Sequence, residues 1–538
     1  MTRRLPLLAL ALVLVTLSVA FARPLPVTPA APLQDAAGDI WWGAVPPGGT
    51  SRPVLVFVHG RRGIGPSWWG PTLYSGVNDT YLYAYNAGYR TAFVQLDGPT
   101  GTPSRSMWSN GETLRGQIDR IANHYGVEQV ILIGHSKGGV DIDTAVVHYG
   151  AARRVSRVFT LASPHWGTPL ADLGYSWWGG WLAAVLGEKD DGLYILQPAY
   201  MRYFRSLTDG RPEKANVPYF TGSGTNWGPL FAPLWFAGLS LGGANDGLVP
   251  EPRTHIPGGM HLFTRDWHHD NIRLGRTAFP LLQPFFEPPA VAAAAGPVAA
   301  PQPAGAGLSL QPALNQILRG GEIDGTTRAG LPVERGVESA GFALLTSDPA
   351  MRGVLVTPAG QRLAAQGHIQ LDGESFFAGA TAWGWDVAAP ESGEWSVEIR
   401  GRGAYLLVVR LESRLDLSLQ GLSADGDLTG ARLSATVPGG QARVSALALP
   451  AIPGQAQPAA IAAGVPFHQR GPLAEAPASL PTSEIVNLAV TITGTTADGS
   501  SFERNLATSI FTGSSHSPVG PRVRIYLPLL PTLGDSKR

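Results

Sequence analysis

A serine stands between glycines where an apolar run gives way to a helical pattern. The segment Gly134 to Gly139, with Ser136 at its third position, follows directly on the apolar run Val130 to Ile133. A sharp turn from a strand into a helix strains the backbone of the serine and projects its hydroxyl out of the sheet, and only glycines fit beside it. The spacing therefore predicts a nucleophilic Ser136 at the end of a buried strand.

A serine nucleophile requires a base, and the base requires an orienting acid. Downstream of Ser136, Asp246 stands in an Asn-Asp-Gly-Leu-Val-Pro turn, and His268 and His269 are adjacent in Trp-His-His-Asp-Asn. We expect Asp246 to be the acid, with Asp97 as a weaker alternative. The residues themselves leave His268 and His269 open as the base, because a shift of one position exchanges them.

The elements that must position these residues follow an alternating pattern. From residue 54 to about 286, β-branched apolar runs alternate with amphipathic stretches, which is typical of a parallel sheet with helices on both faces. The predicted strands cover 54–58, 91–96, 130–133, 158–161 and 217–221. Leu114, Ile118, Ile121 and Tyr125 recur at helical spacing and predict a helix that lies on the sheet. We expect an α/β domain over 36–287.

Five segments resemble the secreted bacterial triacylglycerol lipases of the α/β-hydrolase superfamily. They are Val58 to Gly60, Gly134 to Gly139, Ser163 to Pro169, Asn245 to Val249, and His268 to Asp270. The resemblance covers about 54–286 and implies an α/β-hydrolase fold. It also implies that Asp246 is the acid, that His268 is the base, and that the backbone amides of Arg61 and Lys137 form the oxyanion hole. Lys137 departs from the pattern, because the family often has Gln, Met or His there.

The same resemblance raises the question of a metal. Some lipases of this family bind a structural calcium ion through the aspartate just after the catalytic histidine, and Asp270 occupies that position. Calcium prefers six to eight oxygen ligands, and no second acid is evident near 222–229. Ester hydrolysis by a triad requires no cofactor. Calcium at Asp270 therefore stays an open alternative.

The segment between Pro169 and Val217 is rich in aromatic residues. The resemblance implies that it forms a lid and an acyl-binding wall, whereas an ordinary helical cap packed on the sheet is the alternative. The apolar and aromatic side chains of this segment disfavour charged or sugar substrates. The candidate substrate-binding residues are Trp177, Trp178 and Trp181 in this segment, with Trp68 and Trp69 beside the oxyanion loop.

Four other histidines carry no catalytic pattern. His135 lies inside the serine turn and is expected to pack. His165 is expected to brace a loop, and His255 and His261 stand in Pro/Gly-rich sequence, where we expect surface or structural roles.

Composition and the N-terminus predict an exported protein. The chain has 538 residues, with 40 Lys plus Arg and 40 Asp plus Glu, which disfavours a nucleic-acid partner. Arg3 and Arg4 precede an apolar stretch that ends at Ala20-Phe21-Ala22, so we expect a signal peptide over 1–22 and a secreted or cell-surface location. An uncleaved anchor is the alternative, and no transmembrane helix is expected after cleavage. With no cysteine, an exported form holds together without disulfides.

The remainder of the chain changes character. Residues 288–307 are nearly all Ala, Pro and Gly and predict a linker. Short alternating runs then predict a β-sandwich-like domain over 308–450 and a small β domain over 482–538. An Ala/Pro/Gln-rich stretch over 451–481 is expected to be a second linker.

These observations predict a secreted serine hydrolase of carboxylic esters. A lipase acting on acyl esters, at an oil–water interface where the substrate is lipid, fits the resemblance best. One alternative is a polyester depolymerase or short-chain esterase whose C-terminal modules bind the substrate. Another is a non-catalytic cell-surface binding protein on a hydrolase scaffold.

Overall fold

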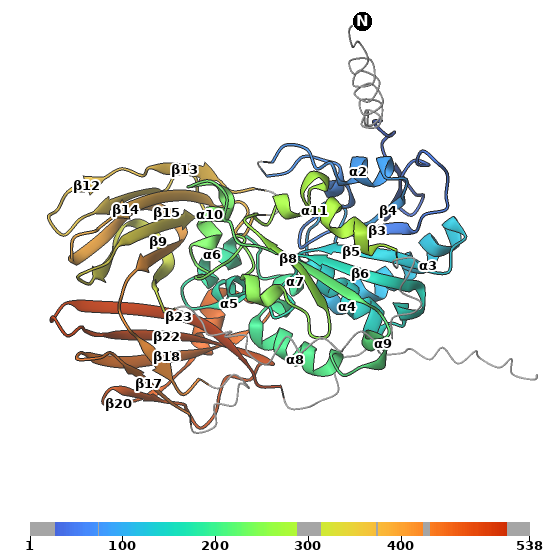
Figure 1. Ribbon diagram of the computed structural model, residues 1–538. Helices are drawn as coiled ribbons and strands as arrows, with labels where there is room; N and C mark the ends of the chain where they lie inside the picture. The colour runs from blue at the N-terminus through green and yellow to red at the C-terminus, as the bar shows by residue number, and fades with distance from the viewer. Residues whose placement is uncertain (1–26, 74, 288–313, 373–374, 423–430, 514–538) are drawn as a thin grey trace, which may run out of the picture.

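The computed structural model describes residues 27–73, 75–287, 314–372, 375–422 and 431–513. The signal peptide predicted for 1–22 and the linker predicted for 288–307 lie outside these residues. The described chain forms two halves, an α/β half up to residue 287 and an all-β half from residue 314, which lie side by side (Figure 1).

An eight-stranded sheet forms the centre of the first half. Its order is β1-β2-β4-β3-β5-β6-β7-β8; the strands from β3 to β8 run parallel, and β2 joins β4 antiparallel. Every residue of β3 and β5 is buried, because helices cover both faces of the sheet, and both strands therefore begin as continuous apolar runs. The bounds are Leu33–Gln34 (β1), Ile40–Trp42 (β2), Val54–Val58 (β3), Arg90–Val94 (β4), Val130–His135 (β5), Val155–Leu161 (β6), Tyr219–Gly224 (β7) and Met260–Arg265 (β8).

Helices from four parts of the chain cover the two faces. Apolar residues of α3 and α4 pack on one face of the sheet, and those of α2 and α11 pack on the other. This arrangement confirms the predicted fold class. The helices are Thr80–Asn86 (α2), Met107–Tyr125 (α3), Lys137–His148 (α4), Pro169–Tyr175 (α5), Gly180–Val185 (α6), Asp191–Ile195 (α7), Pro198–Thr208 (α8), Pro212–Ala215 (α9), Pro233–Gly238 (α10) and Gly275–Leu282 (α11). Short 3-10 turns include Glu251–Thr254 (η3) and Asn271–Arg273 (η4).

Three antiparallel sheets make up the second half, which confirms the prediction of an all-β region. The first contains β9 (Gln316–Val333), β10 (Ser339–Thr346), β11 (Arg352–Val356), β12 (Arg362–Leu363), β13 (Gly367–Gln370), β14 (Thr381–Ala388) and β15 (Gly393–Glu412). The second has the order β16-β17-β21-β20, with β16 (Ser418–Gln420), β17 (Arg432–Thr436), β20 (His468–Arg470) and β21 (Leu473–Glu475). The third has the order β19-β18-β22-β23, with β18 (Gln441–Ala451), β19 (Val465–Pro466), β22 (Ile485–Thr495) and β23 (Ser501–Phe511).

The predicted division of this half differs from the structure. Strand β18, assigned to a domain over 308–450, pairs along its length with β22, assigned to a separate domain over 482–538. The stretch 451–481, predicted to be a linker, holds helix α12 (Gln457–Ala462) and strands β19 to β21. Its Ala/Pro/Gln-rich composition misled the prediction, because short peripheral elements need few large apolar residues.

Helices α5, α6 and α8 lie between the central sheet and the second half (Figure 1). Leu170, Leu182 and Phe204 from these helices share one apolar cluster with Leu318 and Leu406 of the second half. Two side chains of the second half also reach polar groups of the first. Asn487 Nδ2 donates to the carbonyl of Asp172 (2.9 Å), and Gln457 Nε2 donates to the carbonyl of Ser176 (3.0 Å). The aromatic segment predicted as a lid is therefore covered by the second half.

The carboxyl group of Asp172, a residue of α5 that contacts the second half, makes the stability of the folded protein sensitive to pH. Burial raises the pKa of Asp172 to about 7, although a hydrogen bond with Ser509 lowers it in part. Because the folded-state pKa lies above the ordinary value of 3.8, ionisation disfavours the packed state. Wild-type stability therefore falls as the pH rises from about 4 to about 7, and this contribution is constant above pH 7.

We expect Asp172→Asn to raise the free energy of unfolding by up to about 4 kcal/mol at pH 8, which corresponds to roughly three pKa units. The gain should shrink steadily towards pH 4, where the wild-type carboxyl is already neutral. Urea unfolding at pH 5, 6, 7 and 8 measures the difference. Asp191→Asn, at an exposed residue of α7, is the matched control and should show no such trend. A gain that is equal at all four pH values would contradict the assignment.

Candidate active site

Ser136 occupies the sharp turn between β5 and α4. Its backbone has φ 53° and ψ −132°, a conformation that non-glycine residues rarely adopt, and its amide donates to the carbonyl of Leu161 (2.9 Å). A Cβ atom on Gly138 would lie 2.4 Å from the carbonyl oxygen of His59, so a larger residue does not fit there. These features are those of the predicted nucleophile turn.

Asp246 and His269 form a close pair. The Nδ1 atom of His269 lies 2.8 Å from Oδ2 of Asp246, and the backbone amide of His269 donates to the carbonyl of Asp246 (2.8 Å). The other carboxylate oxygen, Oδ1, accepts from the amides of Leu248 and Val249 (3.0 and 2.8 Å). Asp246 is fully buried, so its orientation is fixed on both sides. This contact leaves Nε2 of His269 available for proton transfer.

The structure corrects the choice of His268 as the partner of Asp246. Nδ1 of His268 accepts a hydrogen bond from the amide of Asn271 (3.2 Å), and its Nε2 lies 3.5 Å from the hydroxyl of Ser75. Burial lowers the pKa of His268 to about 4. The error is one position: the resemblance selected the histidine two places before Asp270, whereas the backbone register presents the next histidine to Asp246.

His135 supports the site, whereas His165 and Asp97 take no part in the Asp246–His269 pair. His135 is buried, its Nε2 lies 2.8 Å from the carbonyl of His269, and burial holds its pKa well below its usual range. The neutral ring therefore braces the backbone of His269. His165 lies beside Thr160 (3.0 Å). Asp97 accepts hydrogen bonds from the Ser104 hydroxyl and the Arg105 amide (2.8 and 2.9 Å). Its carboxylate therefore stabilises the loop between β4 and α3.

The loop after β3 lies against the nucleophile. A Cβ atom on Gly60 would be 2.8 Å from Cβ of Ser136, so this backbone approaches the serine closely. The next residue, Arg61, pairs with Glu188 (2.7 Å) and Asp190 (2.9 Å) of the loop between α6 and α7. Burial works against the charge of Arg61, but the two carboxylates outweigh it and raise its pKa. The ion pairs therefore tie the loop after β3 to the aromatic segment.

Lys137 points away from solvent and pairs with Asp141 one turn later on α4. Nζ of Lys137 lies 2.8 Å from Oδ1 of Asp141, and Asn110 Nδ2 donates to Oδ2 (3.0 Å). Burial raises the pKa of Asp141 to about 6, although Lys137 lowers it in part. The side chain of Lys137 thus stabilises the start of α4, and only its backbone amide remains a candidate for the oxyanion hole.

Ser136 and His269 line the same small cleft, of about 50 Å³. Its walls are largely apolar, and two residues, Ser375 and Phe376, come from the second half of the chain. The other lining residues are Arg61, Arg62, Pro164, Thr168, Leu170, Leu193, Leu196, Leu248 and Val249. No pattern in the sequence points to Ser375 or Phe376, because their position depends on how the two halves pack.

The predicted tryptophans lie elsewhere. Trp68 is buried against Phe57, and Trp69 packs on Phe93, on the face of the sheet covered by α2 and α11. Trp177, Trp178 and Trp181 join the apolar cluster between the two halves. The described lining of the Ser136 cleft includes none of the five, so their assignment as substrate-binding residues is corrected to packing.

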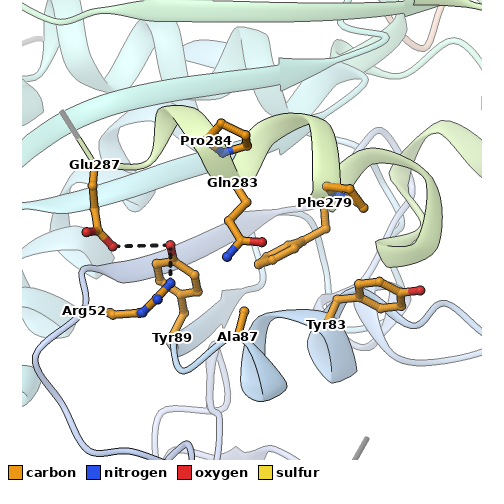
Figure 2. Close-up of a pocket in the computed structure, with 9 residues that line it drawn as sticks. Arg52, Tyr83, Ala87, Tyr89, Phe279, Gln283, Pro284 and Glu287 are labelled. Carbon is orange, nitrogen blue, oxygen red and sulfur yellow. Dashed lines mark hydrogen bonds between the residues drawn. The ribbon is translucent and has the colours of Figure 1, made fainter. Parts of the chain in front are cut away.

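A larger pocket, of about 570 Å³, opens on another part of the surface (Figure 2). Arg52 donates to the hydroxyl of Tyr89 (3.0 Å), which donates to Glu287 (3.4 Å), and Phe279 forms an apolar wall. Its described lining holds no serine and no histidine. The smaller Ser136 cleft is therefore the candidate active site.

Asp270 does not fit a calcium site. Its carboxylate is buried and pairs with Arg273 (3.1 Å), so a cation from the chain already faces it. Calcium takes six to eight oxygen ligands, and a guanidinium group at this carboxylate is incompatible with that shell.

A family model described as the alpha/beta hydrolase fold matches residues 53–190. Together with the sheet and the serine turn, this match shows that the chain is an α/β hydrolase by fold. Within the described residues, no helix has both the length and the apolar character needed to span a membrane.

Among solved structures, the chain is similar to the lipase BlEst2 of Bacillus licheniformis. The propeptide form of that lipase is 27% identical, covers 88% of this chain and 97% of its own, and has a TM-score of 0.70. The mature form is 38% identical, covers 44% of this chain and 93% of its own, and has a TM-score of 0.40. No curated protein matches the sequence. The α/β-hydrolase fold and the likeness of most of the chain to the propeptide form of this lipase support hydrolase activity.

Proposed function

We propose that the protein hydrolyses carboxylic esters through Ser136, His269 and Asp246. The observation that carries the proposal is that Ser136, in a strained turn, and His269, paired with Asp246, line one apolar cleft. A buried pair of this kind orients the imidazole and stabilises the cation that forms when it takes a proton. The likeness to a Bacillus licheniformis lipase supports an ester as substrate.

The reaction then follows the acyl-enzyme course. Ser136 Oγ attacks the ester carbonyl carbon while His269 Nε2 takes the hydroxyl proton. We assign the amides of Arg61 and Lys137 as the donors to the developing oxyanion, and a donor of this kind contributes about 3–4 kcal/mol of transition-state stabilisation. Cleavage of the ester C–O bond releases the alcohol, which receives the proton from His269. A water molecule then attacks the acyl carbonyl carbon while His269 Nε2 takes its proton. The bond to Ser136 Oγ breaks, the carboxylic acid product leaves, and His269 returns the proton to Ser136.

The apolar lining favours an acyl chain over a charged substrate. Leu170, Leu193, Leu196, Leu248 and Val249 all face the cleft. We therefore favour a lipase acting on acyl esters, including lipid at an oil–water interface. A polyester or short-chain ester is the alternative substrate class, and the N-terminal pattern supports a secreted enzyme in either case.

The test is hydrolysis of p-nitrophenyl esters from acetyl to palmitoyl, together with emulsified triglyceride. We expect Ser136→Ala to lower the rate by at least about 10⁴-fold while the circular dichroism spectrum is unchanged. Serine-dependent activity on long chains and emulsion supports a lipase, and activity confined to short chains supports an esterase or polyester hydrolase. Absence of activity and of Ser136 labelling by a phosphonate, both in the intact protein and after the chain is cut between its two halves, would overturn the proposal in favour of a binding protein.

We further propose that the second half of the chain restrains this activity. Ser375 and Phe376 close the cleft, and about 50 Å³ is far less than the roughly 300 Å³ at which binding sites for small molecules usually begin. The loop that holds Arg61 is also held from the other side, since Lys189 donates to Gln457 Oε1 (2.8 Å) and accepts from the amide of Gly454 (2.7 Å). The similar Bacillus licheniformis structure that spans both halves is a propeptide form.

A further inference from the structure

A second group of reactive side chains lies outside the catalytic cleft. Glu251 and His255 come from η3 and the residue that follows it, and His261 comes from β8. Their potential ligand atoms, two imidazole nitrogens and one carboxylate oxygen, all lie within 4.8 Å of one another. Each residue is partly exposed, so a small solute can reach them.

The rings are oriented so that one nitrogen of each faces the carboxylate side of the cluster. Nε2 of His255 lies 2.9 Å from Oε1 of Glu251. Nδ1 of His261 lies 2.8 Å from the hydroxyl of Thr221, which leaves its Nε2 directed at Thr264 Oγ1 (2.9 Å). The hydroxyl of Thr264 in turn donates to Oε1 of Glu251 (2.9 Å). Both Nε2 atoms and one carboxylate oxygen therefore converge on one region.

The backbone holds both sides of this cluster in place. The amide of Glu251 donates to the carbonyl of Ala244 (2.9 Å), and Trp166 Nε1 donates to the carbonyl of His255 (2.9 Å). His261 pairs with Thr221 in the β7–β8 ladder. The two rings stack with centroids 4.0 Å apart and an interplanar angle of 15°. The side chains thus start from a fixed arrangement.

We propose that Glu251, His255 and His261 bind a divalent transition-metal ion, with zinc as the ion that their chemistry favours. Two imidazole nitrogens and one carboxylate oxygen form a ligand set that zinc uses, with water free to complete a tetrahedral shell. The contact of Thr221 with Nδ1 of His261 is the outer hydrogen bond that commonly fixes a metal-bound imidazole. Ligands of one tetrahedral zinc lie roughly 3.3 Å apart, and the separations within this cluster, from 2.9 Å between His255 and Glu251 up to 4.8 Å, need only small side-chain movements to reach that value.

The ion would connect two segments that lead to the active site. Glu251 follows the turn that carries Asp246, and His261 lies on the strand that precedes His269. None of the three ligands lines the described cleft around Ser136. The ion would therefore stabilise the positions of acid and base from outside, and the proposal stands whether or not the protein hydrolyses esters.

The test uses untagged full-length protein that has been stripped of metal with a chelator and then dialysed. Zinc chloride alone is titrated in competition with a chromophoric chelator, and bound metal is counted by mass spectrometry. His255→Gln and His261→Gln remove one ligand each, and His124→Gln, at an exposed histidine stacked on Trp42, is the matched control. Cobalt(II) added to the wild-type protein gives a second measurement that needs no variant.

We expect one zinc ion per chain, at least tenfold weaker binding in each ligand variant, and unchanged binding in His124→Gln. Bound cobalt should show the intense visible absorption of a tetrahedral site, and zinc should raise the melting temperature of the wild type but not of the ligand variants. Absence of stoichiometric zinc at micromolar concentration would overturn the proposal. So would equal binding by wild type and both ligand variants, or an octahedral cobalt spectrum.

Discussion

Replacing His269 with alanine is expected to lower kcat/KM for a p-nitrophenyl ester by at least about 10⁴-fold. His269 is the histidine whose Nδ1 contacts Asp246 at 2.8 Å and which lines the cleft with Ser136. Without its imidazole, no described group in the lining of that cleft can take the serine proton. Phosphonate labelling of Ser136 should fall in parallel, because the same proton transfer activates the serine.

His268→Ala provides the matched comparison, since it removes the same ring one position away. Nδ1 of His268 accepts from Asn271, whereas the carboxylate of Asp246 contacts His269, so we expect kcat/KM to change by less than about tenfold. Circular dichroism and melting temperature of both variants exclude unfolding as the cause. A loss of 10⁴-fold in His268→Ala, with His269→Ala still active, would restore the assignment that the lipase resemblance implied.

The sequence predicted the central strands well and the edge of the sheet poorly. Strand β3 was predicted with its observed bounds, because a strand buried on both faces must be a continuous apolar run. Strand β8 was missed, since its residues Met260 to Arg265 are mostly exposed or half-buried and show little periodicity. This omission mattered, because β8 carries His261 and leads to His269.

The nucleophile and the acid each lie in a local motif, whereas the base does not. Ser136 and Asp246 were recognisable because a strained turn and a tight Asn-Asp-Gly turn leave a mark in neighbouring residues. Which histidine faces Asp246 is decided by the hydrogen bond from the amide of His269 to the carbonyl of Asp246, 23 positions away. No pattern in adjacent residues encodes that register.

The pocket was the least predictable part, because two halves of the chain build it. An aromatic segment in isolation indicates a lid, and its tryptophans then look like a substrate wall. In the structure Trp178 lies under the second half, as the apolar cluster that it shares with Leu318 shows. Phe376, one of the two residues of the second half that line the cleft, lies 240 positions after the nucleophile.

Cutting the chain between the two halves is expected to raise ester hydrolysis. A protease site is introduced within residues 288–313, the intact protein is purified and assayed, and it is assayed again after cleavage and separation of the halves. If the uncovered state is populated at less than about a tenth in the intact chain, release raises kcat/KM by at least about tenfold. The increase should be larger for palmitoyl than for acetyl esters, because Phe376 is part of the lining of a cleft that is too small for a long acyl chain.

Phe376→Ala keeps the chain intact and tests the same contact. We expect it to raise activity on long-chain esters by several-fold, since it removes one wall of a cleft of only about 50 Å³ without disturbing Ser136 or His269. The two halves share an extensive apolar cluster and can stay associated after cleavage. Phe376→Ala tests the contact in that case too, because it does not require the halves to separate. Ser136→Ala in the cut protein is the control: any activity gained on cleavage should be lost in this variant if it comes from the Ser136 site. Equal activity before and after separation, with no gain from Phe376→Ala, would mean that the second half stabilises the aromatic segment rather than restraining catalysis.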